Sequence, residues 1–532
     1  MPCISATALS SMAEAGEPRM AGYLLAGLAG VLLACIAADI NAQATTLAMA
    51  DIRGHLGVGI DRGSWFETLF SVGEVMGMLV APWLAIAFSM RRFAAFATVM
   101  LAVLSVGCAA VNSPELFYGL RYLQGLSTGF LIPLLMTVAL RFLTPSIKLF
   151  GLAAYALTAT FAPNFGAPVV AWAHQVAGYD AIYLSVVPVA ALAFGLIVYG
   201  IPQDPLHLER FKQLDWIGLI LGWTAGICIV ALFSQGERLD WLHSPLIDVL
   251  AIVGGVSLVV FVWHECYHPV PFIWPQLLLR PNFAFGTIML FGFIVLGFAF
   301  STLPSRFLSE VHGYRPAQTM PVAMIVALPP LVLLPAVSWL LNFKRVDARW
   351  CLVVGLVLVA TTCLLYTQVS PDWIRHNFYL GQSIAVVGQA LVVVSLLMLA
   401  TGVVAPQEGP YAAATINVTR ALAAPIGTGV LDWFLRSRVD THSHALLDRI
   451  GAHRYELAQS TALTGHDPAP MRADGASASA ISQFASHIQS QAQTLALADG
   501  WQLMLVLAVV LLMTCVITER VYPPRLKIPP GT

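Results

Sequence analysis

Long apolar stretches alternate with short polar ones along most of the chain, from residue 21 to residue 518. A helix needs about 20 predominantly apolar residues to cross the hydrocarbon core of a bilayer. The stretches that meet this requirement are 21–47, 64–88, 93–111, 115–138, 149–173, 181–201, 214–234, 246–264, 283–306, 318–341, 350–368, 377–400, 408–433 and 499–518. The pattern therefore predicts an all-α membrane protein with fourteen transmembrane helices.

Charged segments between the apolar stretches divide the predicted helices into three groups. Six helices fall within residues 1–201, and six more fall within residues 283–532. Between them, residues 202–282 contain a charged cytoplasmic linker and two further helices. We expect two six-helix bundles joined by an inserted helix pair.

The one long connection, residues 434–498, is polar and rich in Ala, Ser, Gln and His. Connections longer than about 12–15 residues are usually functional or disordered. Near its end, Ile481, Phe484 and Ile488 recur close to the helical period. We expect an extracytoplasmic loop that contains some helix.

The distribution of Lys and Arg predicts the orientation of the chain. When successive connections are assigned to alternate sides, one side collects fourteen Lys and Arg, and the short loops of the other side hold six. Short cytoplasmic loops retain positive charge, so both termini are predicted to be cytoplasmic. The first apolar stretch has no A-x-A-like cleavage site, and we expect it to remain as the first span.

Composition agrees with this class and excludes others. Hydrophobic residues make up 58% of the 532 residues and charged residues 10%, against about a quarter charged in soluble domains. The net charge of −1 provides no basic surface for nucleic acid. The eight cysteines include no CxxC pair, so we expect neither a disulfide framework nor a zinc ribbon.

Five ionisable residues lie inside predicted spans: Asp39, Glu67, Glu74, Arg121 and Arg420. An ionised side chain at the bilayer centre costs at least ~2.5–3.5 kcal/mol, so such residues usually face an interior and mark function. At about 1.5 Å per residue, Asp39, Glu74 and Arg121 fall in one layer, roughly 9 to 15 Å below the extracytoplasmic surface. Glu67 lies two turns above Glu74 on the same helical face. Acids beside an arginine could carry protons from outside to the middle of the membrane.

Structural roles remain open for two of these residues. Glu67 is shallow enough to reach the membrane surface with its carboxylate. Asp39 could be a hydrogen-bond partner of Asn41 or Gln43. For Glu74 and Arg121 a purely structural role is less favoured, because their depth leaves the charge no easy route to water.

Three motifs resemble those of the fourteen-helix drug:proton antiporters of the major facilitator superfamily, the EmrB/QacA subfamily. L-F-Y-G-L-R-Y-L-Q-G-L-S-T-G, with Arg121, Gln124 and Gly125, resembles the family's R-x-x-Q-G motif, in which the arginine is implicated in proton coupling. A-T-I-N-V-T-R-A-L-A-A-P-I-G-T-G, with Asn417 and Arg420, is similar to its N-x-x-R-x-x-G run. L-P-S-R-F-L-S-E-V-H-G-Y-R-P-A-Q looks like a segment of the family's ninth span.

Other positions depart from the family pattern. In the first span, Asn41 stands where the family has an acid, and Asp39 is two residues away. The loop motif keeps Arg91 and Arg92, expected at a cytoplasmic gate, but loses its acid. Glu74 lies where the family commonly has no acid, and it is a candidate to compensate for the acid that the first span lacks.

The antiporter motif of the fifth span is also degraded. It is reduced to F-A-P-N-F-G-A-P-V-V-A, which contains Asn164 and Pro168. We assign Gln124, Asn164, Pro168, Asn417 and Arg420 to the substrate cavity or to helix packing. Because this motif is degraded, an importer of an organic acid or metabolite with the same fold remains the alternative to an exporter.

The resemblance implies a transporter rather than an enzyme, with no catalytic residues and no cofactor except the proton gradient as energy source. It implies export of lipophilic or amphipathic compounds across the inner membrane of a Gram-negative bacterium. It also implies a periplasmic adaptor (membrane fusion) protein and an outer-membrane channel as partners. The lipid bilayer surrounds the chain, and no nucleic acid partner is expected.

A rival motif is W-H-E-C-Y-H-P, which contains the H-E-x-x-H pattern of zinc proteases in His264, Glu265 and His268. It lies where the eighth predicted span leaves the membrane, and Pro269 follows it directly. No distant acid in a matching Asp-Gly context supplies a third ligand. We interpret the motif as a coincidence, expect no metal site, and keep an intramembrane zinc protease only as a remote alternative.

Overall fold

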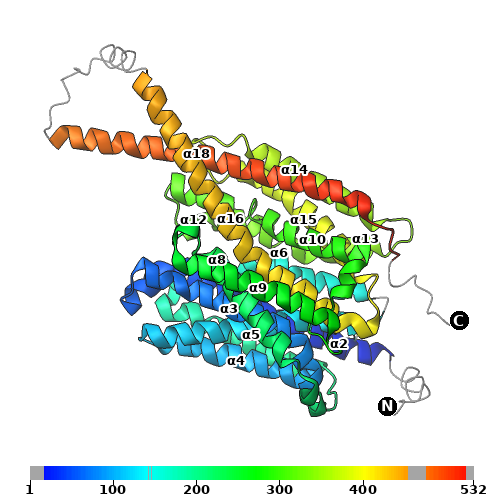
Figure 1. The fold of residues 1–532 in the computed structure, drawn as a ribbon. Coiled ribbons are helices and arrows are strands. Elements are labelled where there is room, and N and C mark those ends of the chain that lie inside the picture. Colours follow the sequence, from blue (N-terminus) through cyan, green and yellow to red (C-terminus); the bar gives the residue numbers. More distant parts are fainter. Residues whose placement is uncertain (1–16, 142, 145–146, 453–474, 523–532) are drawn as a thin grey trace.

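The computed structural model describes residues 17–141, 143–144, 147–452 and 475–522. Every regular element in these ranges is a helix, as the apolar pattern predicted. Helices satisfy all backbone hydrogen bonds within the segment, which a chain buried in hydrocarbon requires. The start of α2 and the end of α18 lie at one end of the molecule, which we call the termini end (Figure 1).

The first half of the chain forms six helices. They are α2 (Glu17–Leu56), α3 (Ile60–Phe88), α4 (Met90–Ala110), α5 (Pro114–Arg141), α6 (Lys148–Leu184) and α7 (Val186–Gly200). Helices α3 and α5 approach so closely that a Cβ on Gly125 would meet the backbone of Phe70. A Cβ on Gly129 would meet the carbonyl oxygen of Glu74. Small residues let membrane helices pack this tightly, so the backbone that carries Glu74 is fixed against α5.

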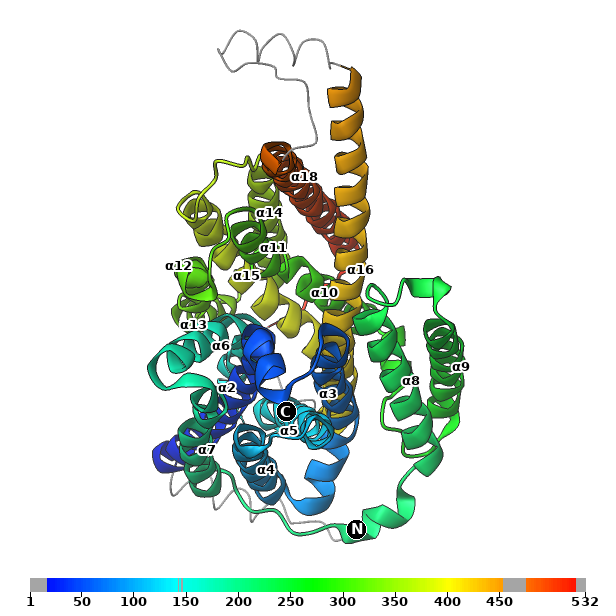
Figure 2. The ribbon, with the colours of Figure 1, turned by 90° about the vertical axis from the view of Figure 1, so that its left-hand side faces the viewer.

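The middle of the chain forms the inserted helix pair with short 3-10 helices around it. The elements are η1 (Leu208–Gln213), α8 (Trp216–Gln235), η2 (Trp241–His243), α9 (Pro245–Tyr267) and η3 (Pro275–Leu279). Helix α8 packs against both α3 and α16, one helix from each half of the chain (Figure 2). Trp223 of α8 donates its indole N–H to the carbonyl oxygen of Met76 at 3.3 Å. The pair therefore covers one of the two lines along which the halves meet.

The second half is built mostly from long helices with short breaks. Its elements are α10 (Pro281–Gly297), α11 (Thr302–Arg306), η4 (Phe307–Val311), α12 (Pro316–Ala327), α13 (Pro330–Leu341), α14 (Ala348–Tyr366), α15 (Asn377–Thr401), η5 (Pro406–Glu408), α16 (Gly409–Ala452), α18 (Gly475–Thr514) and η6 (Cys515–Ile517). Asp347 caps the start of α14, where its side chain accepts a hydrogen bond from the backbone N–H of Arg349.

Twelve segments of the described residues are long and apolar enough to cross a membrane. Of the two other predicted spans, 149–173 lies within α6, and 408–433 begins at the last residue of η5 and continues in α16. Within the described residues, α6 offers the apolar stretch Lys148–Ala162. In α16, polar residues such as Asn417 and Arg420 interrupt the apolar run. The count of fourteen therefore stays a prediction.

Residues 434–452 and 475–498, which the sequence placed in an extracytoplasmic loop, continue α16 and begin α18. These two arms project beyond the rest of the molecule, away from the termini end (Figure 1). Arg438 Nε donates to Asp499 Oδ2 at 2.5 Å and His442 Nε2 lies 2.7 Å from the same oxygen, so an ion pair and a hydrogen bond join the arms where they leave the bundle. The side chains of Ile481 and Phe484 lie outside the described residues.

Candidate transport site between the two halves

Arg121 of α5 is completely buried and forms the centre of a polar network in the first half. Its Nη1 donates to Gln124 Oε1 at 2.7 Å, and its guanidinium lies 4.4 Å from the centre of the Phe70 ring. Gln124 in turn donates to Asn41 of α2 at 3.1 Å and to Ser105 of α4 at 3.4 Å. The R-x-x-Q-G residues thus join three helices, and Asn41 is part of the same network.

Glu67 of α3 has an exposed side chain that accepts a hydrogen bond from Thr46 of α2 at 3.2 Å. It interacts electrostatically with Arg121 of its own half and with Asp432 of the second half. Its carboxylate therefore lies in the space between the halves, where water reaches it. Of the acids in α3, Glu67 rather than Glu74 is the electrostatic neighbour of Arg121.

Arg420 of α16 is the basic residue beside the two deeper acids, Asp39 and Glu74. It interacts electrostatically with Asp39 of α2 and with Glu74 of α3. Its Nη1 donates to Thr158 Oγ1 at 2.5 Å and its Nη2 to the Thr158 carbonyl oxygen at 2.6 Å. One side chain from the second half is thereby held against α6 and faces two carboxyl groups of the first half.

Asp39 is almost fully buried, with 9% of its surface exposed. Its Oδ2 has no hydrogen-bond partner among the described residues. A buried ionised carboxylate is costly unless a positive charge or a proton compensates it. The compensation available to Asp39 is Arg420, so a change at either residue alters the energy of the other.

The other predicted residues occupy several different places. Asn417 is fully buried, accepts a hydrogen bond from Tyr155 at 2.9 Å and donates one to the Ala413 carbonyl oxygen at 2.7 Å. Asn164 donates within its own helix, to the Thr160 carbonyl oxygen at 2.8 Å. Asn417 thus connects the two halves, whereas Asn164 does not.

The residues of the predicted gate and fifth-span motif lie apart from the charged centre. Pro168 is buried in α6. Arg91 is half-buried and Arg92 is exposed, both in the first turn of α4. The amide oxygen of Gln203 accepts a hydrogen bond from Arg92 Nη2 at 2.7 Å. Arg92 therefore contacts the segment that follows α7.

Tyr155 and Thr158, which hold Asn417 and Arg420 across the halves, were not predicted from the sequence. Both lie in an apolar run without charge, so the cost of burying charge did not single them out. A charged cavity of about 340 Å³ toward the end where the arms project was not predicted either. There Arg306 pairs with Asp432 and Arg436 with Glu237, at 2.5 and 3.0 Å, and Glu310 lines the same cavity.

Two halves of membrane helices around a buried charged centre define a transporter, and the comparisons with known proteins identify the family. The family model of the Major Facilitator Superfamily matches residues 29–428. The chain belongs to the Major Facilitator Superfamily. The family consists of transporters, and membership favours this class over an enzyme.

Curated relatives of the chain include multidrug export proteins and a resistance protein. It is 24% identical to the multidrug export protein EmrB of Haemophilus influenzae, over 84% of this chain and 87% of that protein. It is 22% identical to EmrB of Escherichia coli strain K12, over 82% and 84% respectively. It is 23% identical to the fatty acid resistance protein FarB of Neisseria gonorrhoeae, over 84% and 87%. The chain is thus an EmrB-like transporter of the multi-pass inner-membrane class.

Solved structures confirm the fold. A POT family transporter in complex with 5-aminolevulinic acid aligns with a TM-score of 0.56 at 15% identity, over 93% of this chain and 97% of that one. The human organic anion transporter MFSD10 aligns with a TM-score of 0.53 at 14% identity, over 92% and 100%. At this level of identity the likeness concerns the fold alone.

Proposed function

We propose that the protein is a proton-coupled exporter of lipophilic or amphipathic compounds. The observation that carries the proposal is Arg420, which reaches from the second half to Asp39 and Glu74 of the first half. Internally repeated transporters work by rocking one half against the other around a central site. A basic side chain shared between acids of the opposite half makes the rocking sensitive to protons and to charged substrate.

The proposed cycle uses the charge balance at this centre. When Asp39 and Glu74 are ionised, they attract Arg420 and hold the two halves together. A proton on either carboxyl weakens that attraction, because it removes a negative charge from a buried site of low dielectric. Glu67, which is exposed, is the first acid that a proton from the arm side meets, and it passes the proton towards the deeper pair.

The orientation and partners belong to the same proposal. The termini end is cytoplasmic, all fourteen predicted helices span the inner membrane of a Gram-negative cell, and the arms of α16 and α18 point into the periplasm. There they contact a periplasmic adaptor that leads to an outer-membrane channel. No cofactor besides the proton gradient is required. The relatives named for export favour export over import, and FarB adds fatty acids to the substrate classes worth testing.

The test is uptake by inverted membrane vesicles, in which export appears as accumulation inside. We expect an imposed gradient, acid inside, to drive uptake of a lipophilic cationic dye and of a medium-chain fatty acid. A protonophore should abolish that uptake. Accumulation that is indifferent to the protonophore, or efflux in place of uptake, would contradict proton-coupled export.

A further inference from the structure

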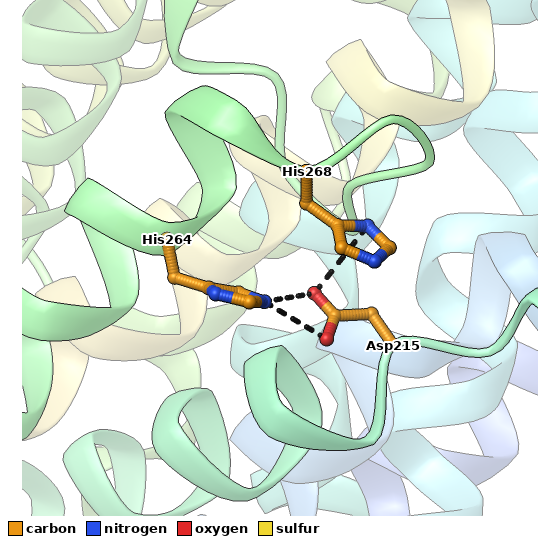
Figure 3. A group of neighbouring side chains, drawn as sticks. All are labelled: Asp215, His264 and His268. Atoms are coloured by element: carbon orange, nitrogen blue, oxygen red, sulfur yellow. Dashed lines mark hydrogen bonds and ion pairs between the residues drawn. The ribbon is translucent and has the colours of Figure 1, made fainter.

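The end of α9 and the start of α8 bring Asp215, His264 and His268 together (Figure 3). His264 Nε2 lies 2.9 and 2.8 Å from the two carboxylate oxygens of Asp215. His268 Nδ1 lies 3.6 Å from Asp215 Oδ2. One ligand atom from each residue falls within 4.8 Å of the others, although 49 residues separate Asp215 from His264 in the chain.

The local sequence explains why these side chains converge. His264 lies in the last turn of α9 and His268 is the C-cap residue directly after it, and the two rings stack with their centres 5.3 Å apart. Asp215 is the N-cap of α8, where its Oδ1 accepts a hydrogen bond from Gly218 N at 2.8 Å. That bond fixes the carboxylate, which is 3% exposed, toward the imidazoles. Asp215, which has no Asp-Gly context and was not predicted from the sequence, thus lies beside both histidines of the H-E-x-x-H pattern.

A second carboxylate lies at the same place. Glu265 is 1% exposed, and its Oε2 accepts a hydrogen bond from Ile273 N at 2.9 Å. Its Oε1 has no hydrogen-bond partner among the described residues. A Cβ on Gly218 would touch both this oxygen and Asp215 Oδ2. The buried carboxylates of Asp215 and Glu265 are thus close together. The two imidazoles, which carry at most one positive charge between them, compensate the two negative charges poorly.

We propose that Asp215, His264 and His268 bind a divalent transition-metal ion, with zinc as the favoured ion, and that the ion fastens the end of α9 to the start of α8. Imidazole nitrogens and carboxylate oxygens are zinc ligands, bound at about 2.0–2.2 Å. Two ligand atoms on one tetrahedral ion are then about 3.3–3.6 Å apart. The Asp215–His268 separation already matches, and the Asp215–His264 separation needs to open by only a few tenths of an ångström.

The site is structural rather than proteolytic. In zinc proteases with this pattern, the glutamate acts as a base on metal-bound water beside the substrate. Here Glu265 is buried and engaged with the backbone of residue 273. It is placed to offset the charge of the ion rather than to meet a peptide. Because α8 packs against both halves, the ion would stiffen the element that bridges them.

The experiment uses the purified full chain in detergent, without a histidine tag and freed of metal by a chelator. Zinc affinity is measured by competition with a chromogenic chelator, and coordination by the visible absorption of Co²⁺. We expect about one ion per chain. His268→Ala and Asp215→Asn should each weaken binding at least about tenfold. Asn keeps the helix cap, and His268→Ala loses only a stacking contact with His264, a 3.3 Å hydrogen bond from Val270 N and a 3.6 Å contact with Asp215, so neither variant should unfold without metal.

His243→Ala is the matched control, because His243 is an exposed histidine of the same helix pair that pairs with Asp240 outside the site. It should bind zinc as the native chain does. Equal affinity in the native chain, His268→Ala and Asp215→Asn, or no binding by the native chain, would overturn the proposal. This outcome is independent of the transport assay, since a chain without the ion can still move substrate.

Discussion

Tyr155 of α6 donates its hydroxyl to Asn417 of α16 across a distance of 2.9 Å, and this bond joins the two halves of the protein. Arg420 adds two hydrogen bonds to Thr158 in the same region. Ser338 Oγ donates to the Leu149 carbonyl oxygen at 3.2 Å near the start of α6. The halves are thus tied along the part of α6 nearest the termini end, whereas Glu67 on the arm side is exposed.

Tyr155→Phe should loosen this connection, because it removes one hydroxyl and leaves the ring. A neutral buried hydrogen bond contributes about 1 kcal/mol, which corresponds to roughly a fivefold change in an opening equilibrium. Buried Cys35 interacts electrostatically with both Tyr155 and Arg420, so its alkylation reports opening there. We expect alkylation several-fold faster in Tyr155→Phe, measured by mass spectrometry with exposed Cys266 replaced by serine.

Tyr183→Phe is the control for that experiment. Tyr183 is also buried and hydrogen-bonded, at 3.3 Å to Thr45, but both residues belong to the first half. It should leave the alkylation rate of Cys35 unchanged. The same rate increase in both variants would mean that general loosening, and not the bond between halves, is measured.

Neutral substitutions of the acids test the proposed coupling. Asp39→Asn and Glu74→Gln keep shape but cannot carry a proton, so we expect proton-driven uptake in inverted vesicles to fall to background with expression intact. Glu67→Gln should retain a substantial part of the activity, because water can replace an exposed acid. Uphill transport that survives Glu74→Gln would remove Glu74 from the mechanism. Equal loss at Glu67 would instead favour a structural role for both residues of α3.

Arg121→Lys should shift the pH dependence of transport. The guanidinium donates to Gln124 and its carbon lies 4.4 Å from the centre of the Phe70 ring, an arrangement that suits a planar fork better than the point charge of lysine. We expect a displaced pH profile of uptake with the folded chain recovered in normal yield. Arg141→Lys, at a solvent-exposed ion pair with Asp204, should keep the native profile. Superimposable profiles for Arg121→Lys and the native chain would reduce Arg121 to a generic positive charge.

Asp347 predicts a pH-dependent contribution to stability outside the spans. Burial disfavours its ionised form, but hydrogen bonds from Arg349 and the charge of Arg520 outweigh burial, so the pKa of Asp347 is lowered. A carboxyl with a lowered pKa in the folded state stabilises the fold above its unfolded pKa of about 3.9. That contribution is lost as the pH falls through the folded-state pKa.

Asp347→Asn keeps the helix cap and removes the charge. Because both arginines are more than a third exposed, the lost stability at pH 7 should be small, about 1 kcal/mol or less. The Tm of the variant in detergent should therefore lie slightly below that of the native chain at pH 7 and approach it under strongly acidic conditions. A Tm difference that grows on acidification would show that the sign is wrong.

Shortening the arms tests the proposed adaptor contact. A flexible linker in place of residues 443–495 leaves Arg438, His442 and Asp499 in position. We expect loss of resistance in intact cells and loss of the co-purifying adaptor, while uptake by inverted vesicles continues. Resistance that persists in intact cells would exclude the arms as the docking site.

The cost of burying a charge in the membrane predicted the candidate residues but not their neighbours. It singled out Arg121 and Arg420 because each interrupts an apolar run, and both are indeed packed between helices. Depth along a helix does not reveal which helix of the other half faces a side chain. Only the structure therefore shows that Arg420 is the partner of Asp39 and Glu74. It also shows that Thr158 holds Arg420 in place.

The continuous arms of α16 and α18 and the position of Asp215 also depend on how helices pack, which the sequence does not reveal. Helical period at the end of the long connection indicated some helix, but only the fold shows that α16 and α18 run on without a break into the arms. Asp215 precedes His264 by 49 residues, and nothing in its local sequence marks it as a metal ligand. The packing of α8 against α9 brings Asp215 to the histidines. Apolar periodicity predicts these two helices as spans but does not predict how they lie along each other.

The position of α8 between α3 and α16 also limits how a compound dissolved in the bilayer can reach the centre. Helix α8 fills the space between α3 and α16. Its Trp223 donates to the α3 backbone, and Gly429 of α16 lies against the backbone of Phe233 in α8. On the opposite line α6 packs against α12 and α13, and Ser338 donates to the Leu149 carbonyl oxygen there. Helices therefore cover both lines where the halves meet, so a compound in the lipid reaches the centre only when the halves move apart.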